Sequence, residues 1–163
     1  MDISLITSFF AHPPLDWVIF GVLVLIIGID ALRSGTARAA TLSIALPVTL
    51  FFSNTLSHAI LVGPFIDKFS NPLIEAAIFG GIFIVVFFLT YRIMYSLGGN
   101  AAPPFASIMA SFAATIVMYV MWLQVPALQS VWHFGPQIQS IFGALYAFWW
   151  MLVAYLALAF IRS

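Results

Sequence analysis

The chain has 163 residues, of which 64% are hydrophobic and only 6% are charged, whereas roughly a quarter of the residues of soluble domains are charged. This composition predicts an integral membrane protein, and the length is enough for one helical bundle without a separate soluble catalytic domain. The formal net charge is zero and the five basic residues are scattered, which argues against a nucleic-acid surface and a polybasic lipid patch. No cysteine is present, which excludes disulfides and thiolate metal sites.

Residues 1–14 form an N-terminal segment that is too short to cross a bilayer but apolar enough to lie in the interface. The segment has no basic region ahead of its apolar residues, so we do not expect a cleaved signal peptide. Residues 15–163 then form a single transmembrane domain.

Five apolar runs follow, and each approaches the roughly 20 residues that a helix needs to cross a bilayer. They predict an all-α polytopic bundle with spans over residues 15–32, 39–62, 72–97, 104–123 and 138–161. Asn71-Pro72 and Pro103-Pro104 are typical of helix starts, and Pro47 predicts a kink in the second span. The alternative is four spans followed by an irregular C-terminal segment.

The basic residues predict the orientation of these spans. With five spans, Arg33, Arg38, Arg92 and Arg162 fall on one side of the membrane and only Lys68 on the other. The excess of basic residues marks the cytoplasmic side. We therefore expect the N-terminus outside and the C-terminus inside.

The loop between the first two spans contains three of the ten charged residues, Asp30, Arg33 and Arg38, together with Gly35. Asp30 and Arg33 are three residues apart and are predicted to pair across one helical turn. The loop either anchors the helices through this pair and lipid phosphates or offers a docking surface to a cytoplasmic partner. The composition of the loop does not distinguish between these two roles.

Polar side chains recur along the second span at positions four residues apart. We expect them to form one intramembrane polar stripe that faces away from lipid and approaches Glu75 of the third span; its members are Thr49, Ser53, Asn54, Ser57 and His58. The stripe is either a proton-sensitive or polar pathway or a set of hydrogen bonds between helices worth about 0.6 kcal/mol each.

Small side chains recur four apart at the start of the fourth span, a pattern that lets membrane helices approach closely. The predicted packing residues are Ala106, Ser107, Ala110, Ser111 and Ala114.

Motifs of enzymes are not found. The chain has no Gly-x-Ser-x-Gly elbow, His-Glu-x-x-His motif or P-loop, and His12, His58 and His133 lack the spacing of metal ligands. We predict no catalytic residues, no metal and no cofactor.

The sequence resembles the opening of the colicin V production protein family. That family has a Leu-Asp entry, one helix, an Arg-Gly-x-x-Arg-Glu motif and a second helix; here Leu15-Asp16 opens the first span, and Gly35 and Arg38 match the motif. Ser34 stands where the family has arginine, and Ala39 replaces the acidic residue. The resemblance implies a multi-pass protein of the bacterial inner membrane, connected with colicin V export and envelope homeostasis and without an enzymatic reaction.

We therefore expect a non-enzymatic accessory or scaffold protein. One alternative is an oligomeric pore or transporter subunit, lined by the polar stripe and assembled through the small-residue face of the fourth span. Another is a structural subunit of a larger membrane complex. The expected partners are the lipid bilayer and further copies of the chain or other membrane proteins, and not nucleic acid.

Overall fold

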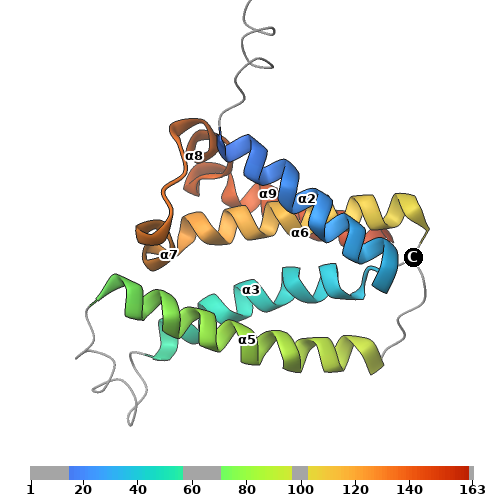
Figure 1. Cartoon of the computed structure of the whole chain (residues 1–163), viewed down its shortest axis with the longest axis horizontal. Coiled ribbons are helices and arrows are strands. Elements are labelled where there is room, and N and C mark those ends of the chain that lie inside the picture. The colour runs from blue at the N-terminus through green and yellow to red at the C-terminus, as the bar shows by residue number, and fades with distance from the viewer. Residues whose placement is uncertain (1–14, 57–70, 97–102, 162–163) are drawn as a thin grey trace, which may run out of the picture.

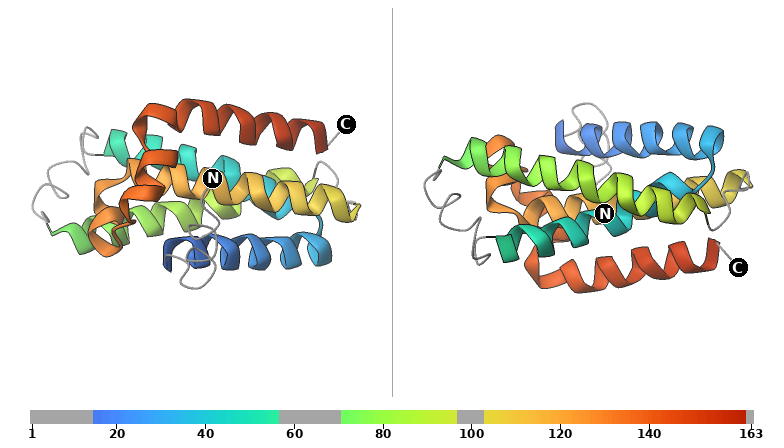
Figure 2. Two further views of the ribbon diagram at one scale, coloured as in Figure 1. Left: turned by 90° about the horizontal axis from the view of Figure 1, so that it is seen from above. Right: turned by 90° about the horizontal axis from the view of Figure 1, so that it is seen from below.

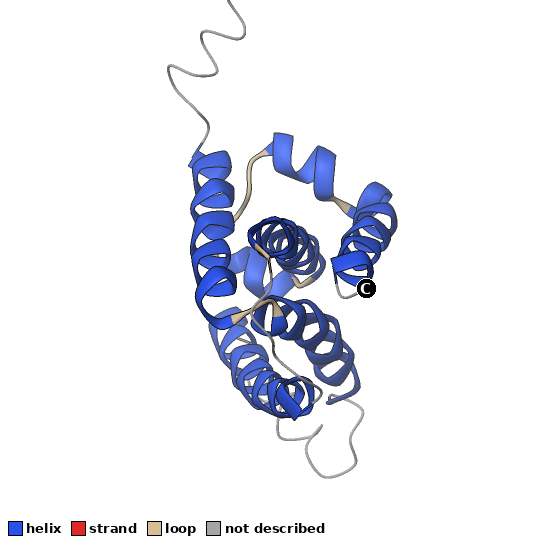
Figure 3. Cartoon of the chain, turned by 90° about the vertical axis from the view of Figure 1, so that its right-hand side faces the viewer, coloured by secondary structure: helices blue, strands red, loops and turns tan. Residues whose placement is uncertain are grey.

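The computed structural model describes residues 15–56, 71–96 and 103–161, and within these ranges all regular structure is helical (Figure 3). The helices are α2 (Leu15–Ser34), α3 (Ala37–Leu56), α5 (Pro72–Ser96), α6 (Pro104–Gln124), α7 (Pro126–Val131), α8 (Pro136–Phe142) and α9 (Ala144–Ile161). The prediction of an all-α bundle is confirmed. The expected interfacial segment over residues 1–14 lies outside the described residues.

The five long helices run up and down beside one another, and α6 lies at the centre (Figures 1 and 2). Helix α6 contacts α2, α3 and α9, while α5 packs on the far side of α3. The short helices α7 and α8 lie together at the end of the bundle where α2 begins (Figure 1). The Tyr155 hydroxyl of α9 donates a hydrogen bond of 2.8 Å to the Ser43 carbonyl of α3, which links these two helices directly.

Helix α6 is central because one face of it carries very small side chains. In its apolar stretch 61% of the residues are buried, compared with 6% in α2 and 11% in α5. Ala110 and Ala114 are completely buried. Small side chains let neighbouring backbones approach, and close packing is the main source of helix association where lipid replaces water.

Within the described residues, Gly35 and Gly143 each lie where the chain turns between two helices. Gly35 has a φ of 82°, a left-handed conformation that costs other residues energy, and it lets α3 begin only three residues after α2 ends. Gly143 separates α8 from α9, which meet at 61°. A side chain at Gly143 would collide with the Gln139 carbonyl, so the break requires glycine.

The number of helices that can cross a bilayer differs from the expected five. Among the described residues, α2, α5 and α6 are long and apolar enough, and the bent pair of α8 and α9 would make a fourth. The described part of α3 is less apolar than these helices and is not one of them. It nevertheless lies between α5 and α6 and contacts both.

Three expected boundaries are corrected. The helix predicted over residues 39–62 begins at Ala37, and its described part ends at Leu56. The helix predicted over residues 138–161 is two helices divided at Gly143. The connection between the spans predicted over residues 104–123 and 138–161 contains α7, which starts at Pro126 because proline suits the first turn of a helix. By contrast, Asn71 caps α5 as its sequence indicates, accepting a 3.0 Å hydrogen bond from the Leu73 amide.

Candidate functional site

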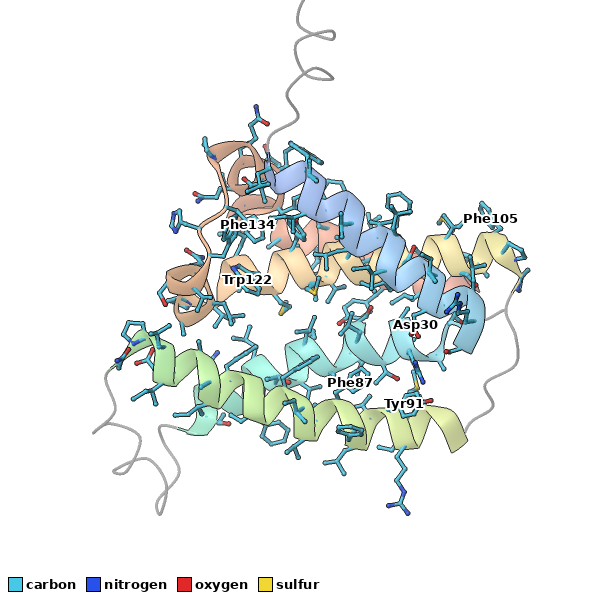
Figure 4. All side chains as sticks on the ribbon, in the orientation of Figure 1. Asp30, Phe87, Tyr91, Phe105, Trp122 and Phe134 are labelled. Atoms are coloured by element: carbon cyan, nitrogen blue, oxygen red, sulfur yellow. The ribbon has the colours of Figure 1, made fainter. Side chains whose placement is uncertain are left out.

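The candidate site is a recess of about 410 Å³ at the end of the bundle where α2 turns into α3. Helix α3 lies between α2 and α5 at this point, and the three helices line the recess together (Figure 4). The lining residues are Ile26, Ile27 and Asp30 of α2, Arg38, Ala39 and Leu42 of α3, and Phe87, Phe88 and Tyr91 of α5. The recess is therefore apolar except for its Asp30, Arg38 and Tyr91 side chains.

Asp30 forms an ion pair with Arg38, not with Arg33 as predicted. The Arg38 Nη1 donates to Asp30 Oδ1 over 2.8 Å, and the Ser34 hydroxyl donates to the same oxygen over 3.4 Å. The left-handed turn at Gly35 brings the first turn of α3 back beside the last turn of α2. Helical spacing alone could not reveal this partner.

Tyr91 of α5 completes the charged cluster. The Arg38 guanidinium carbon lies 5.8 Å from the centre of the Tyr91 ring, within the range of a cation–π contact. A hydrogen bond with Tyr91 and the charge of Asp30 both raise the pKa of Arg38 above its ordinary value, so this side chain stays cationic. Arg38 thus ties α5 to α2, and Tyr91 and Phe87 were not predicted as site residues because no local motif marks them.

The predicted polar stripe does not continue through the interior. Thr49 is completely buried and donates to the Ala45 carbonyl over 2.7 Å, and Ser53 is half-buried, but Asn54 is exposed. Glu75 is also exposed. Ser57 and His58 lie outside the described residues, so the structure leaves their predicted place beside Glu75 untested.

The buried polar residues of α3 lie mostly closer to its N-terminus than predicted. Thr41 and Ser43 are completely buried, and they donate to the carbonyls of Ala37 and Ala39 over 2.7 Å and 2.9 Å. Each hydroxyl is thus bonded to the backbone one turn earlier. Small residues such as Ala39 and Ala45 on either side of Thr41 and Ser43 are the sequence signal for this buried face.

All five predicted packing residues of α6 are buried: Ala106, Ser107, Ala110, Ser111 and Ala114. Helix α2 covers part of this face, since the Ser107 hydroxyl donates to the Ala31 carbonyl over 3.3 Å. A side chain carbon added to Gly28 would lie 3.4 Å from the Ser111 hydroxyl. Helices of the same chain, α2, α3 and α9, thus pack on α6, and assembly of several copies through α6 stays a prediction.

A second polar cluster holds the opposite end of the bundle together. The Gly135 amide donates to Asp16 Oδ2 over 2.6 Å, and the Tyr119 hydroxyl donates to the Asp16 carbonyl over 3.0 Å. The Trp17 indole donates to the Gln137 side chain over 3.3 Å. Asp16 therefore fixes the segment before α8 onto α2, a role that its position at a helix start did not indicate.

The neighbouring tryptophans of α9 have different surroundings. Trp150 donates to the Ile141 carbonyl over 2.7 Å and its ring lies 5.0 Å from that of Phe142, whereas Trp149 is 60% exposed. The bend at Gly143 gives Trp150 this neighbour.

The described residues contain no group of three or more histidine, aspartate or glutamate side chains arranged to hold a metal ion. Comparisons with protein-family models, with curated proteins and with solved structures gave no match for the chain.

Proposed function

We propose that the chain is a non-enzymatic integral membrane protein that acts as an accessory or scaffold in the bacterial inner membrane, as its resemblance to the colicin V production family implies. One observation supports this most: the polar groups of the interior are bonded to backbone, while the outer surface is apolar. Thr41, Ser43, Thr49 and Thr115 each donate to a carbonyl one turn earlier. Such bonds satisfy each hydroxyl within its own helix and leave few interior polar groups for chemistry.

The outer surface of the bundle offers large apolar side chains for lateral contacts. Leu25 of α2 is 64% exposed, Phe88 of α5 is 65% exposed and Phe148 of α9 is 67% exposed. Soluble monomers seldom expose apolar side chains so continuously. Lipid chains or the helices of other membrane proteins would cover them.

The ends of the bundle support the proposed orientation. Arg33 and Arg38 lie where α2 turns into α3, and Arg92 lies in the last turns of α5 at the same end (Figure 1). Asp16 and Glu75 begin α2 and α5 at the other end. With the basic end in the cytoplasm, α2 would start outside.

The test is photo-crosslinking from single outward positions in living cells. A photoreactive residue at Leu25, Phe88 or Phe148 should give adducts with a defined membrane protein, and the chain reconstituted in liposomes should conduct neither ions nor small solutes. Flux that is abolished when Thr49→Cys or Asn54→Cys is chemically modified would instead support the pore. The chain is free of cysteine, so either introduced thiol is modified alone.

A further inference from the structure

The recess beside Asp30 and Arg38 joins an apolar groove to a charged end. Its apolar lining includes Ile27 of α2, Leu42 of α3 and Phe87 of α5. Its volume of about 410 Å³ falls within the range of roughly 300–1,000 Å³ that is usual for small-molecule sites. The shape and polarity suit a ligand with an apolar tail and a charged head.

The groove is open on its apolar side. Ile26 is 58% exposed and Phe88 is 65% exposed, and they lie on α2 and α5, two of the helices apolar enough to cross a bilayer. A ligand would therefore enter sideways, from the hydrocarbon region. This access favours a membrane lipid over a water-soluble molecule.

The charged end lies in the last turns of α2, and with the bundle inserted as proposed it would lie at the depth of lipid headgroups. The Asp30 and Arg38 side chains are 40% and 46% exposed, so both are accessible. The Arg38 guanidinium has five N–H donors, and its bond to Asp30 runs from Nη1. Tyr91 takes up a further hydrogen bond of the guanidinium, and the remaining N–H groups suit a phosphate, while the Asp30 carboxylate can accept further hydrogen bonds.

The two side chains together are neutral, which determines the headgroup that fits. An anionic headgroup would gain from Arg38 but be repelled by Asp30. A zwitterionic headgroup satisfies both, because its phosphate faces the guanidinium and its ammonium faces the carboxylate. A primary ammonium donates hydrogen bonds to the carboxylate, whereas a trimethylammonium group cannot.

We infer that this recess binds a zwitterionic phospholipid with a primary ammonium, with its phosphate on Arg38, its ammonium on Asp30 and an acyl chain between Ile26 and Phe88. The inference rests on the proposed insertion of the bundle into a membrane. It gives the scaffold a specific lipid component at its cytoplasmic end.

The experiment is native mass spectrometry of the full chain, released from gentle detergent after addition of one defined lipid. The probes are dioleoyl phosphatidylethanolamine, phosphatidylcholine and phosphatidylglycerol, which differ only in the headgroup. We expect the ethanolamine lipid to bind about tenfold more tightly than either of the others, equivalent to about 1.4 kcal/mol. Asp30→Asn should remove this preference, and Arg38→Met should weaken all three lipids.

Matched variants distinguish lipid binding in the recess from lipid binding elsewhere on the chain. Arg33→Ala removes a neighbouring surface charge that does not line the recess, so it should leave lipid binding unchanged. Ile26→Trp narrows the groove without touching the ion pair and should weaken all three lipids about equally. Gly81→Leu fills a second apolar groove between α3 and α5, and an added side chain at Gly81 meets nothing within 4 Å; this variant should bind as the unaltered chain does.

Equal binding of the three lipids, a preference for phosphatidylglycerol, or unchanged binding in both Asp30→Asn and Ile26→Trp would overturn the inference. Extraction of membranes with alkaline carbonate distinguishes this failure from that of the proposed function. A chain that resists extraction but shows no headgroup preference remains a membrane protein without this lipid site. A chain that carbonate releases would refute both.

Discussion

At the scale of single residues, Gly35 determines which charges meet. Its left-handed conformation turns the chain so that Arg38 reaches Asp30. Gly35→Ala should destabilise the folded chain by about 1–2 kcal/mol, since a Cβ is disfavoured in this conformation. Thermal unfolding in detergent measures the loss.

Gly81→Ala is the control for this substitution. Gly81 lies within α5 and an added Cβ would meet nothing within 4 Å, so the same chemical change should be neutral or slightly stabilising. Equal destabilisation by both variants would contradict the role given to the turn.

Asp16 has a comparable role at the other end of the bundle. Asp16→Ala removes the acceptor of the Gly135 amide, and a hydrogen bond to a charged group is worth about 1.5–3 kcal/mol. The segment before α8 should therefore exchange its amide hydrogens faster, as measured by hydrogen–deuterium exchange. Glu75→Ala removes an exposed carboxylate from the first turn of α5, and exchange near Gly135 should then stay as it was. No change in Asp16→Ala would show that the contact is dispensable.

At the scale of helices, the approach of α2 to α6 depends on Gly28. An added Cβ there would already lie 3.4 Å from the Ser111 hydroxyl. Gly28→Leu should force the two helices apart and cost about 1–3 kcal/mol, measured as a lower midpoint of thermal unfolding. Gly21→Leu introduces the same side chain into the same helix at a position with nothing within 4 Å, and should be almost neutral. A similar loss in both variants would mean that α2 does not pack closely through Gly28.

The helices also show which features of the fold the sequence could predict and which it could not. Prolines marked the starts of α5 and α6, and the small-residue pattern identified the face of α6 that is buried, because these signals act within one helix. The break at Gly143 went unpredicted, since one glycine within an apolar run does not distinguish a bend from a continuous helix. Arg38 reaches Asp30 because of the turn between α2 and α3. Tyr91 joins this pair from α5, about fifty residues beyond Arg38 in the chain.

At the scale of the whole molecule, the alternation of helices predicts which ends face which compartment. Ser34 is exposed beside the Asp30–Arg38 pair, and Ser140 is exposed on α8 at the other end. In intact cells, a membrane-impermeant maleimide should label Ser140→Cys, whereas Ser34→Cys should react only after the cells are permeabilised. The opposite result would invert the orientation. Labelling of both from one side would contradict the up-and-down arrangement.

The central place of α6 has a consequence for biosynthesis. The ribosome completes α2, α3 and α5 before α6 and α9 after it, so α2 and α3 are made before the helix on which both of them pack. A nascent chain that stops before Pro104 holds outer helices without their common partner. The polypeptide would therefore be most vulnerable before α6 emerges, when quality-control proteases and insertion factors can still reach α2 and α3, and its core would close only once α6 has been made.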